Sequence, residues 1–166
     1  KTFPRGRKVS IPVPSIPLEF PAGVTVCQVA SGGYHTMALA DDGRIFSWGH
    51  GTEGQLGYPL DGFGVQNAPR EVDSWSVLKM PGIHISCGQE HSAAVSKRGE
   101  VYCWGLGKSG QLGHGNKNSS AVPIKVRNVD HAASVSCGSA HTVVKTKAGR
   151  LFTWGEGNQG QLGHGN

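Results

Sequence analysis

Residues 149–163 read GRLFTWGEGNQGQLG, and the same pattern occurs twice earlier in the chain. Residues 43–57 read GRIFSWGHGTEGQLG, and residues 99–113 read GEVYCWGLGKSGQLG. The Trp-Gly pairs of the three copies are 56 and then 50 residues apart. A period of this length is typical of repeat proteins, in which each repeat is one supersecondary unit. The sequence therefore predicts a chain built from repeats.

Each copy lies among short runs of strand-forming residues. A first run ends in a Gly-x-x-His turn, and a second run follows the turn. A hairpin with a glycine at the same position in every copy then leads into the aromatic run. Asp-Gly, as at Asp42-Gly43, is a typical signal of a two-residue hairpin. A fourth extended piece with a leading proline follows the glycine-rich loop of the first two copies. The expected strands are 26–30, 36–40, 45–49 and 69–72; 84–87, 92–96, 101–105 and 123–126; and 133–137, 142–146 and 151–155.

Four short antiparallel strands per unit of about 50 residues indicate an all-β fold made of β-propeller blades. No run has the apolar spacing of a helix. We expect three repeats, at roughly 24–72, 73–126 and 127–166, after a basic lead-in at 1–22 that contains five of the nine prolines. The last repeat ends before its fourth strand, and the chain begins with Lys1. A fragment of a longer protein is therefore expected.

The first interval is longer than the second because of two insertions, around residues 61–67 and 75–82. Both are expected to be surface loops, and such loops usually give a repeat protein its individual function. Asp61, Phe63 and Trp75 are therefore candidate partner-binding residues.

The chain carries a formal net charge of +5, which permits an acidic partner without selecting one. Four of the cations lie together in the proline-rich lead-in. Either this segment is a solvated tail, or it contacts nucleic acid or chromatin. The candidate contacts are Lys1, Arg5, Arg7 and Lys8.

Four cysteines are few for a disulfide scaffold, and Cys87, Cys103 and Cys137 lie in apolar strand-like runs. This usage favours a reducing compartment, the cytoplasm or the nucleus. No window approaches the roughly 18–20 apolar residues of a membrane span, and the first residues lack the apolar region of a secretory signal. We expect the chain neither to insert into a membrane nor to be exported.

All three copies match the G-x-G-x-x-G dinucleotide fingerprint, at 49–54, 105–110 and 155–160. That fingerprint requires a strand that leads into a helix, whereas here Gln-Leu-Gly follows at once. A repeated structural loop explains three tandem copies better. Gly107-Lys108-Ser109 lacks the first glycine of a P-loop, because Tyr102 occupies that position. No cofactor is expected.

The Gly-x-x-His turns raise the question of metal binding or catalysis. Cys87 and His91, like Cys137 and His141, have the appearance of zinc ligands, but one pair per blade is far from a four-ligand site, and the first copy has Ser31 instead. A Ser–His site would lack an orienting carboxylate at a repeated position. We therefore expect neither metal nor catalytic residues. The residues assigned structural roles are His35, His91, His141, Trp48, Trp104 and Trp154.

Positions that break the repeat are the better candidates for function. The two variable positions of the Gly-x-x-His turn present different side chains in each copy, as a recognition face or a freely drifting surface would. The first position holds Gly33, Gln89 and Ser139, and the second holds Tyr34, Glu90 and Ala140. The candidate partner-binding residues among these are Tyr34, Gln89, Glu90 and Ser139.

The repeated motif resembles that of the regulator of chromosome condensation repeat family. The resemblance covers about residues 24–166: a Gly-x-x-His-(Ser/Thr) turn, a glycine hairpin, then aromatic-x-Trp-Gly-x-Gly-x-x-Gly-Gln-Leu-Gly in every copy. It implies blades of a seven-bladed β-propeller. Three repeats would form part of such a ring, which further sequence or another chain would complete.

Functions within that family diverge. The founding member is a nuclear guanine-nucleotide exchange factor for the GTPase Ran that docks on nucleosomes, and others are scaffolds, ubiquitin-ligase adaptors or a plant UV-B photoreceptor. The photoreceptor's turn reads Gly-Trp-Arg-His, and the corresponding Tyr34, Glu90 and Ala140 disfavour light sensing here.

Three hypotheses about function follow, and none of them requires a catalytic constellation. The first is a protein-interaction scaffold that binds its partner through loops on one propeller face. The alternative is a guanine-nucleotide exchange factor for a Ran- or Rab-like small GTPase, and the second alternative is chromatin or nucleic-acid docking through the basic lead-in.

Overall fold

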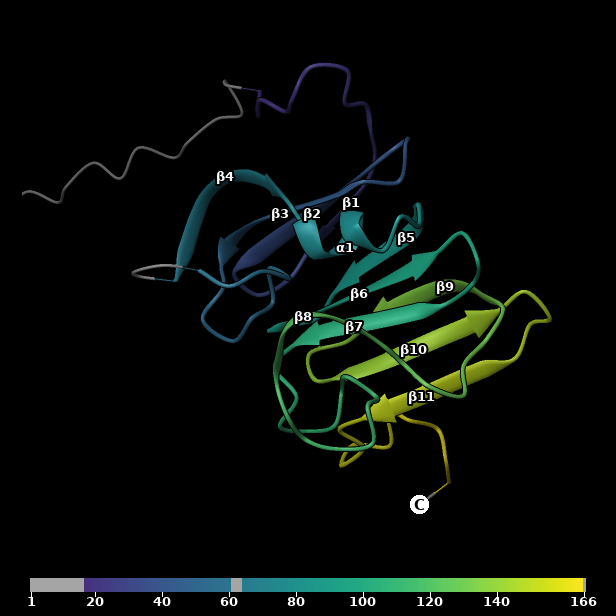
Figure 1. Ribbon diagram of the computed structural model, residues 1–166. Coiled ribbons are helices and arrows are strands. Elements are labelled where there is room, and N and C mark those ends of the chain that lie inside the picture. Colours follow the sequence, from purple (N-terminus) through teal and green to yellow (C-terminus); the bar gives the residue numbers. More distant parts are fainter. Residues whose placement is uncertain (1–16, 61–63, 166) are drawn as a thin grey trace, which may run out of the picture.

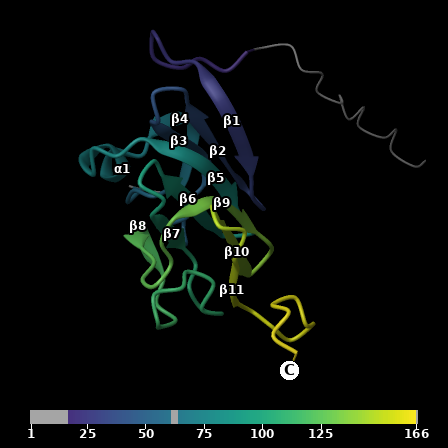
Figure 2. The same ribbon diagram turned by 90° about the vertical axis from the view of Figure 1, so that its right-hand side faces the viewer.

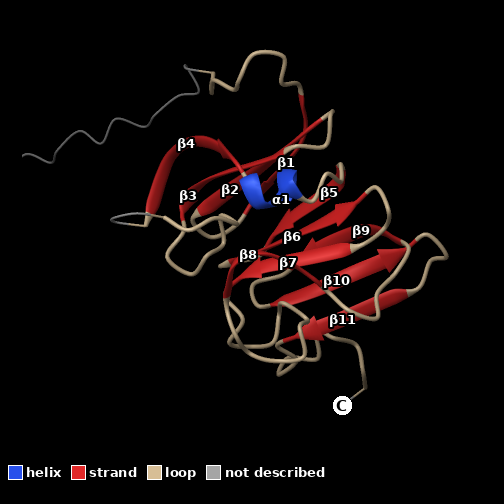
Figure 3. Ribbon diagram, in the orientation of Figure 1, coloured by secondary structure: helices blue, strands red, loops and turns tan. Residues whose placement is uncertain are grey.

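The computed structural model describes residues 17–60 and 64–165, and their regular structure is almost entirely β-strand (Figure 3). Three antiparallel sheets follow one another along the chain, each with its strands paired in sequence order. The first sheet contains β1 (Val26–Ser31), β2 (His35–Ala40), β3 (Ile45–His50) and β4 (Val65–Glu71). The second contains β5 (Gly82–Cys87), β6 (His91–Ser96), β7 (Val101–Gly105) and β8 (Ser120–Lys125). The third contains β9 (Ala132–Cys137), β10 (His141–Thr146) and β11 (Leu151–Gly155).

The sheets are consecutive blades of a β-propeller. Their first strands contact one another, β1 with β5 and β5 with β9. The later strands of each sheet lie successively farther from this common edge, and Figures 1 and 2 show the three sheets side by side. The predicted all-β fold class with four-stranded antiparallel blades, here an incomplete ring, is confirmed.

Two details of the predicted blades were wrong. The fourth strands begin earlier than expected, so residues 65–67 belong to β4 rather than to a surface loop. The β2–β3 hairpin has a three-residue loop, because Gly43 N donates to Ala40 O (3.0 Å) and Ala40 N donates to Arg44 O (2.9 Å). This is a turn followed by a left-handed residue, and Gly43 supplies the positive φ, 89°.

The two largest apolar clusters lie between the blades, and a third, smaller one lies within the first blade around Phe46. One cluster joins the first blade to the second and includes Leu56, Ile85 and Trp104. A second cluster joins the second blade to the third and includes Leu112 and Val144. Each sheet therefore needs its neighbour to cover its apolar face, as expected for stacked repeats.

The outer face of the third blade has no such cover among the described residues. Leu151 is 65% exposed, whereas the residues at the same repeat position, Ile45 and Val101, are 0% exposed. In Figure 1, β11 is the last strand before the C-terminus and pairs only with β10. An exposed apolar strand of this kind is typical of a surface that contacts another element.

A short helix, α1 (Asp73–Val77), precedes the second blade. Its five residues are too few to produce an apolar periodicity, so no helix is predicted from the sequence at this position. The insertion expected as a surface loop at 75–82 thus begins as a helical turn, which ends at Val77, and a short link leads from there to β5.

Candidate interaction face

The Gly-x-x-His turns join the first two strands of each blade, and the histidine ring packs directly on the glycine. A Cβ atom at Gly32 would overlap the ring of His35, and the same overlap occurs at Gly88 with His91 and at Gly138 with His141. None of these glycines has a positive φ. Glycine is therefore required here for close approach and not for an unusual backbone conformation.

Each buried histidine contacts a hydroxyl group of the following blade. His35 Nε2 lies 2.8 Å from Ser92 Oγ, and Ser92 Oγ donates to Gln55 O at 2.7 Å. The second interface repeats this chain, since His91 Nε2 lies 3.0 Å from Thr142 Oγ1. Because the hydroxyl proton points to the carbonyl, the histidine Nε2–H is the donor to the hydroxyl oxygen.

Burial makes these two rings neutral. It lowers the pKa of His35 to about 4 and that of His91 to about 4, because a charged imidazole would lose its hydration between the blades. Both histidines, for which the sequence predicts a structural role, are buried and hydrogen-bonded. His141, on the uncovered face of the third blade, is only half-buried.

The Gln-Leu-Gly triplets complete each blade interface. Gln55 O accepts not only from Ser92 but also from the indole of Trp104, at 3.0 Å. Gln111 O likewise accepts from Thr142 and from Trp154, at 2.8 Å. The loops that match a dinucleotide fingerprint thus present a backbone carbonyl to the next blade, a structural role that the sequence did not assign to the glutamines.

The variable second residue of each turn is held by the residue that follows Trp-Gly in the same blade. His50 N donates to Tyr34 O at 2.8 Å. The second blade has the same bond from Leu106 to Glu90, at 2.8 Å, and the third has it from Glu156 to Ala140, at 2.9 Å. We call this set of six residues the turn strip: Tyr34, His50, Glu90, Leu106, Ala140 and Glu156.

With this geometry established, comparison with known proteins identifies the repeats. One family model of the Regulator of chromosome condensation (RCC1) repeat matches residues 42–95 and 98–144, and a second matches 26–55, 83–111 and 132–161. The chain belongs to the RCC1 repeat family. The predicted family resemblance is confirmed.

Relatives with RCC1 repeats include very different proteins. Human E3 ubiquitin-protein ligase HERC2 is 42% identical over 101 residues, which is 60% of this chain but 2% of HERC2. The mitochondrial RCC1 domain-containing protein RUG3 of Arabidopsis thaliana is 38% identical over 117 residues, 70% of this chain and 24% of RUG3. The chain thus spans a small part of each relative.

Solved structures of RCC1 proteins have the same fold. Human WBSCR16 superposes with a TM-score of 0.76 at 33% identity, over 87% of this chain and 38% of that one. Prp20p from Saccharomyces cerevisiae, described with its binding properties to Gsp1p and histones, gives a TM-score of 0.71 at 25% identity, over 84% and 34%. The chain spans only about a third of each of these two proteins and has the fold of that part.

Four of the predicted partner-binding residues lie together on the edge of the RCC1 blades formed by the Gly-x-x-His turns. Tyr34 is 76% exposed, Gln89 and Ser139 are exposed, and Glu90 is half-buried. His50, Leu106 and Glu156 were missed, although their common position after Trp-Gly could have indicated them. The remaining candidates Asp61, Phe63, Lys1, Arg5, Arg7 and Lys8 lie outside the described residues.

The prediction that Trp75 is an exposed partner-binding residue was wrong. Trp75 lies in α1 and is 1% exposed. Its indole donates to Gly43 O at 3.3 Å, and its ring meets Tyr102 edge to face with centroids 5.2 Å apart. Burial of this large ring between two blades explains why the insertion folds back onto the core.

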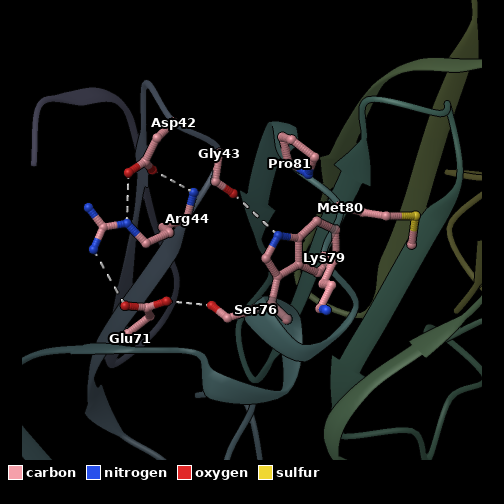
Figure 4. A pocket seen from close by; sticks show the side chains of 9 residues that line it. Asp42, Gly43, Arg44, Glu71, Ser76, Lys79, Met80 and Pro81 are labelled. Carbon is pink, nitrogen blue, oxygen red and sulfur yellow. Dashed lines mark hydrogen bonds and ion pairs between the residues drawn. The ribbon is translucent and has the colours of Figure 1, made fainter.

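A cavity of about 230 Å³ lies beside Trp75 (Figure 4). The β2–β3 hairpin lines it, so it is at the end of the blades opposite the turn strip. Arg44 forms one wall, with Nε 2.7 Å from Asp42 and a terminal nitrogen 3.7 Å from Glu71. The backbone N–H of Arg44 and then its guanidinium lower the pKa of Asp42. Glu71 also accepts from Ser76, so the carboxylates of this wall are paired within the chain.

All four cysteines are free thiols, and all four lie in strands of the blades. Cys87 Sγ donates to Ala30 O at 3.5 Å and Cys137 Sγ to Ser86 O at 3.8 Å, so each thiol contacts the preceding blade. Burial raises the pKa of Cys137 to about 12, which keeps the thiol protonated. Among residues 17–60 and 64–165, no group of three metal-ligating side chains exists, and no helix is long and apolar enough to span a membrane.

We predict that Thr142→Val lowers the free energy of unfolding by about 1–3 kcal/mol, because it removes the hydroxyl shared by His91 and Gln111 O. The measurement is urea unfolding followed by far-UV circular dichroism. Thr36→Val is the matched control: Thr36 holds the same repeat position, and no side-chain hydrogen bond to it occurs in the described part of the chain. Equal destabilisation by both changes would contradict the interblade role of the hydroxyl.

Proposed function

We propose that this chain is a protein-interaction scaffold that binds a protein partner through the edge of its blades that carries the turn strip. The observation that supports this most directly is Tyr34, whose side chain is 76% exposed although its backbone is fixed by hydrogen bonds. Exposed aromatic side chains on a rigid support are typical anchors of protein interfaces. The side chains that differ between the copies give each blade its own surface on a repeated backbone, as in loops that carry function.

The proposal is tested by placing a photo-crosslinking amino acid at position 34 and, as a matched control, at Arg98 on the exposed β6–β7 hairpin at the other end of the blades. We expect position 34 to form a specific crosslink to a protein from the native source, and position 98 to form none to the same protein. Crosslinks at both positions to the same proteins, or none at position 34, would contradict the proposal.

A second candidate is nucleotide exchange on a small GTPase. It is supported by the similarity to Prp20p, a protein described as binding Gsp1p. Acceleration of labelled GDP release from Ran- or Rab-like GTPases supports this candidate. Release at the intrinsic rate from the whole panel contradicts it and leaves the scaffold proposal as the remaining one.

A further inference from the structure

The turn strip is a row of residues whose backbone is held by hydrogen bonds within each blade and between blades. Within a blade, the bonds from His50, Leu106 and Glu156 fix the variable turn residue. Between blades, the turns are linked directly, since Gly33 N donates to Gln89 O and Gln89 N donates to Ser139 O, both at 3.1 Å. The backbone of the strip is therefore preorganised and loses little conformational entropy on binding.

The link between the second and third turns also involves side chains. Ser139 Oγ donates to Gln89 Oε1 at 2.6 Å, so both exposed residues are held next to the strip. Because consecutive turns are joined in this way, the second turn residues follow one another along the edge in the order Tyr34, Glu90 and Ala140. A partner segment that contacts one of these residues and continues along the edge also contacts the next, so the arrangement suits an extended segment.

The side chains of the strip combine an aromatic ring with negative charge. The ring of Tyr34 packs edge-on against His50, with centroids 6.4 Å apart, and the rest of it faces solvent. Glu90 and Glu156 are carboxylates, and none of the six residues is a lysine or an arginine. Neither glutamate takes part in an ion pair among the described residues.

We propose that the turn strip binds an extended, arginine-containing segment of the partner protein. An arginine side chain stacks on the exposed face of Tyr34, and further cations of the segment meet the carboxylates of Glu90 and Glu156. This inference rests on the proposed interaction function and adds the chemistry of the partner to it.

Arginine fits this site better than lysine does. A guanidinium is planar and weakly hydrated, so it stacks on an aromatic face and can still donate hydrogen bonds in its plane to a carboxylate. A lysine ammonium is strongly hydrated and gains less from the ring. An acidic segment or a phosphate-rich ligand would meet two unpaired carboxylates, which disfavours both.

The test uses the 166-residue chain and a fluorescein-labelled Gly-Arg-Gly-Arg-Gly-Arg-Gly peptide, with binding followed by fluorescence polarisation in low salt. The comparison peptides replace every arginine by lysine or by glutamate. We expect the arginine peptide to bind about three-fold more tightly than the lysine peptide, and the glutamate peptide not to bind. Affinity for the arginine peptide should fall as the salt concentration rises. Equal binding of all three peptides, or no binding of the arginine peptide, would overturn the inference.

Variants locate the binding on the strip. Tyr34→Ala and Glu90→Gln should each lower the affinity for the arginine peptide by about two- to five-fold. Tyr34→Phe keeps the aromatic ring and should keep the affinity. Asp130→Asn is the matched control, because Asp130 is an exposed carboxylate between β8 and β9, in none of the ion pairs of the described residues, and at the end of the blades away from the turn strip. A loss with Asp130→Asn as large as with Glu90→Gln would show binding to charge in general and overturn the site.

The two proposals fail in different ways. A specific crosslink from position 34 to a protein whose crosslinked segment contains no arginine, together with no affinity for the arginine peptide, overturns the partner chemistry and leaves the scaffold function standing. Absence of the crosslink contradicts the scaffold function itself.

Discussion

Replacing Trp104 by alanine is expected to lower the free energy of unfolding by about 3–5 kcal/mol, one of the two largest effects that we predict. Trp104 is 0% exposed and lies in the cluster that joins the first two blades. Its truncation leaves a cavity in the apolar core that these two sheets share, and it removes the hydrogen bond to Gln55 O. Urea unfolding of the purified chain, followed by circular dichroism, measures the change.

Trp154→Ala is the matched control, because Trp154 holds the same repeat position and makes the same bond, to Gln111 O. Trp154 is only half-buried, since no blade covers it in the described chain. We therefore expect a loss of about 1–2 kcal/mol. Trp104→Phe separates the two contributions, because it retains most of the apolar volume but not the indole N–H. Equal losses for Trp104→Ala and Trp154→Ala would contradict an interblade core.

Much of the fold could be predicted because the patterns of the first three strands of a blade each occur three times in the sequence. The ends of the first three strands of every blade agree with the structure to within two residues, and Gly99 and Gly149 have the positive φ, 80° in both, that the hairpins were expected to need. Repetition at fixed offsets identified structural residues, since drift does not reproduce the same triplet three times.

The insertion at α1 could not be predicted in the same way, because it occurs once. Its burial depends on Tyr102, which is 27 residues away and in the next blade. Nothing in the local pattern of a five-residue helix distinguishes a buried tryptophan from one on a surface loop. An isolated insertion in a repeat protein therefore has to be placed by its tertiary contacts.

The hydrogen-bond partners of the buried histidines could not be predicted from the sequence either. Each histidine is followed by a hydroxyl residue, but neighbouring residues of a strand point to opposite faces, so Thr36 does not face the ring of His35. The hydroxyl that does contact the ring belongs to the next blade, at Ser92. The Ser or Thr that directly follows a histidine in the second and third blades is thus the hydrogen-bond partner of the histidine in the preceding blade.

The repeats preserve interactions more closely than they preserve residues. Arg44 after the first hairpin glycine lies 3.7 Å from Glu71 on β4. At the same positions of the second blade the charges are exchanged, and Lys125 on β8 lies 2.7 Å from Glu100. Strands three and four are thus joined by an ion pair of either polarity. This exchange explains why charged positions look variable in the repeats although their structural role is the same.

The second large effect is a loss of stability in acid, caused by the buried histidines. The pKa of His35 and that of His91 are each about 4 in the folded chain, against an ordinary value of 6.5. Between these values the unfolded chain binds more protons, so the free energy of unfolding falls as the pH is lowered from 6.5 to 4. Each histidine contributes up to about 3 kcal/mol, which is fully present above pH 6.5. Burial also lowers the pKa of His84 and of His114, which adds to the effect in the same direction.

The measurement is a series of urea unfolding curves between pH 7.5 and pH 4, for the wild type and for a His35→Gln/His91→Gln variant. The variant should be less stable at pH 7.5, because it loses two well-packed rings, but its stability should fall much less on acidification. His131→Asn is the control: His131 is exposed, and asparagine tolerates its left-handed backbone, with φ of 56°. The free energy of unfolding of that variant should change with pH as that of the wild type does. If the double variant loses stability in parallel with the wild type, the acid sensitivity does not come from the blade interfaces, and the neutral histidine–hydroxyl chain is not what acid disrupts.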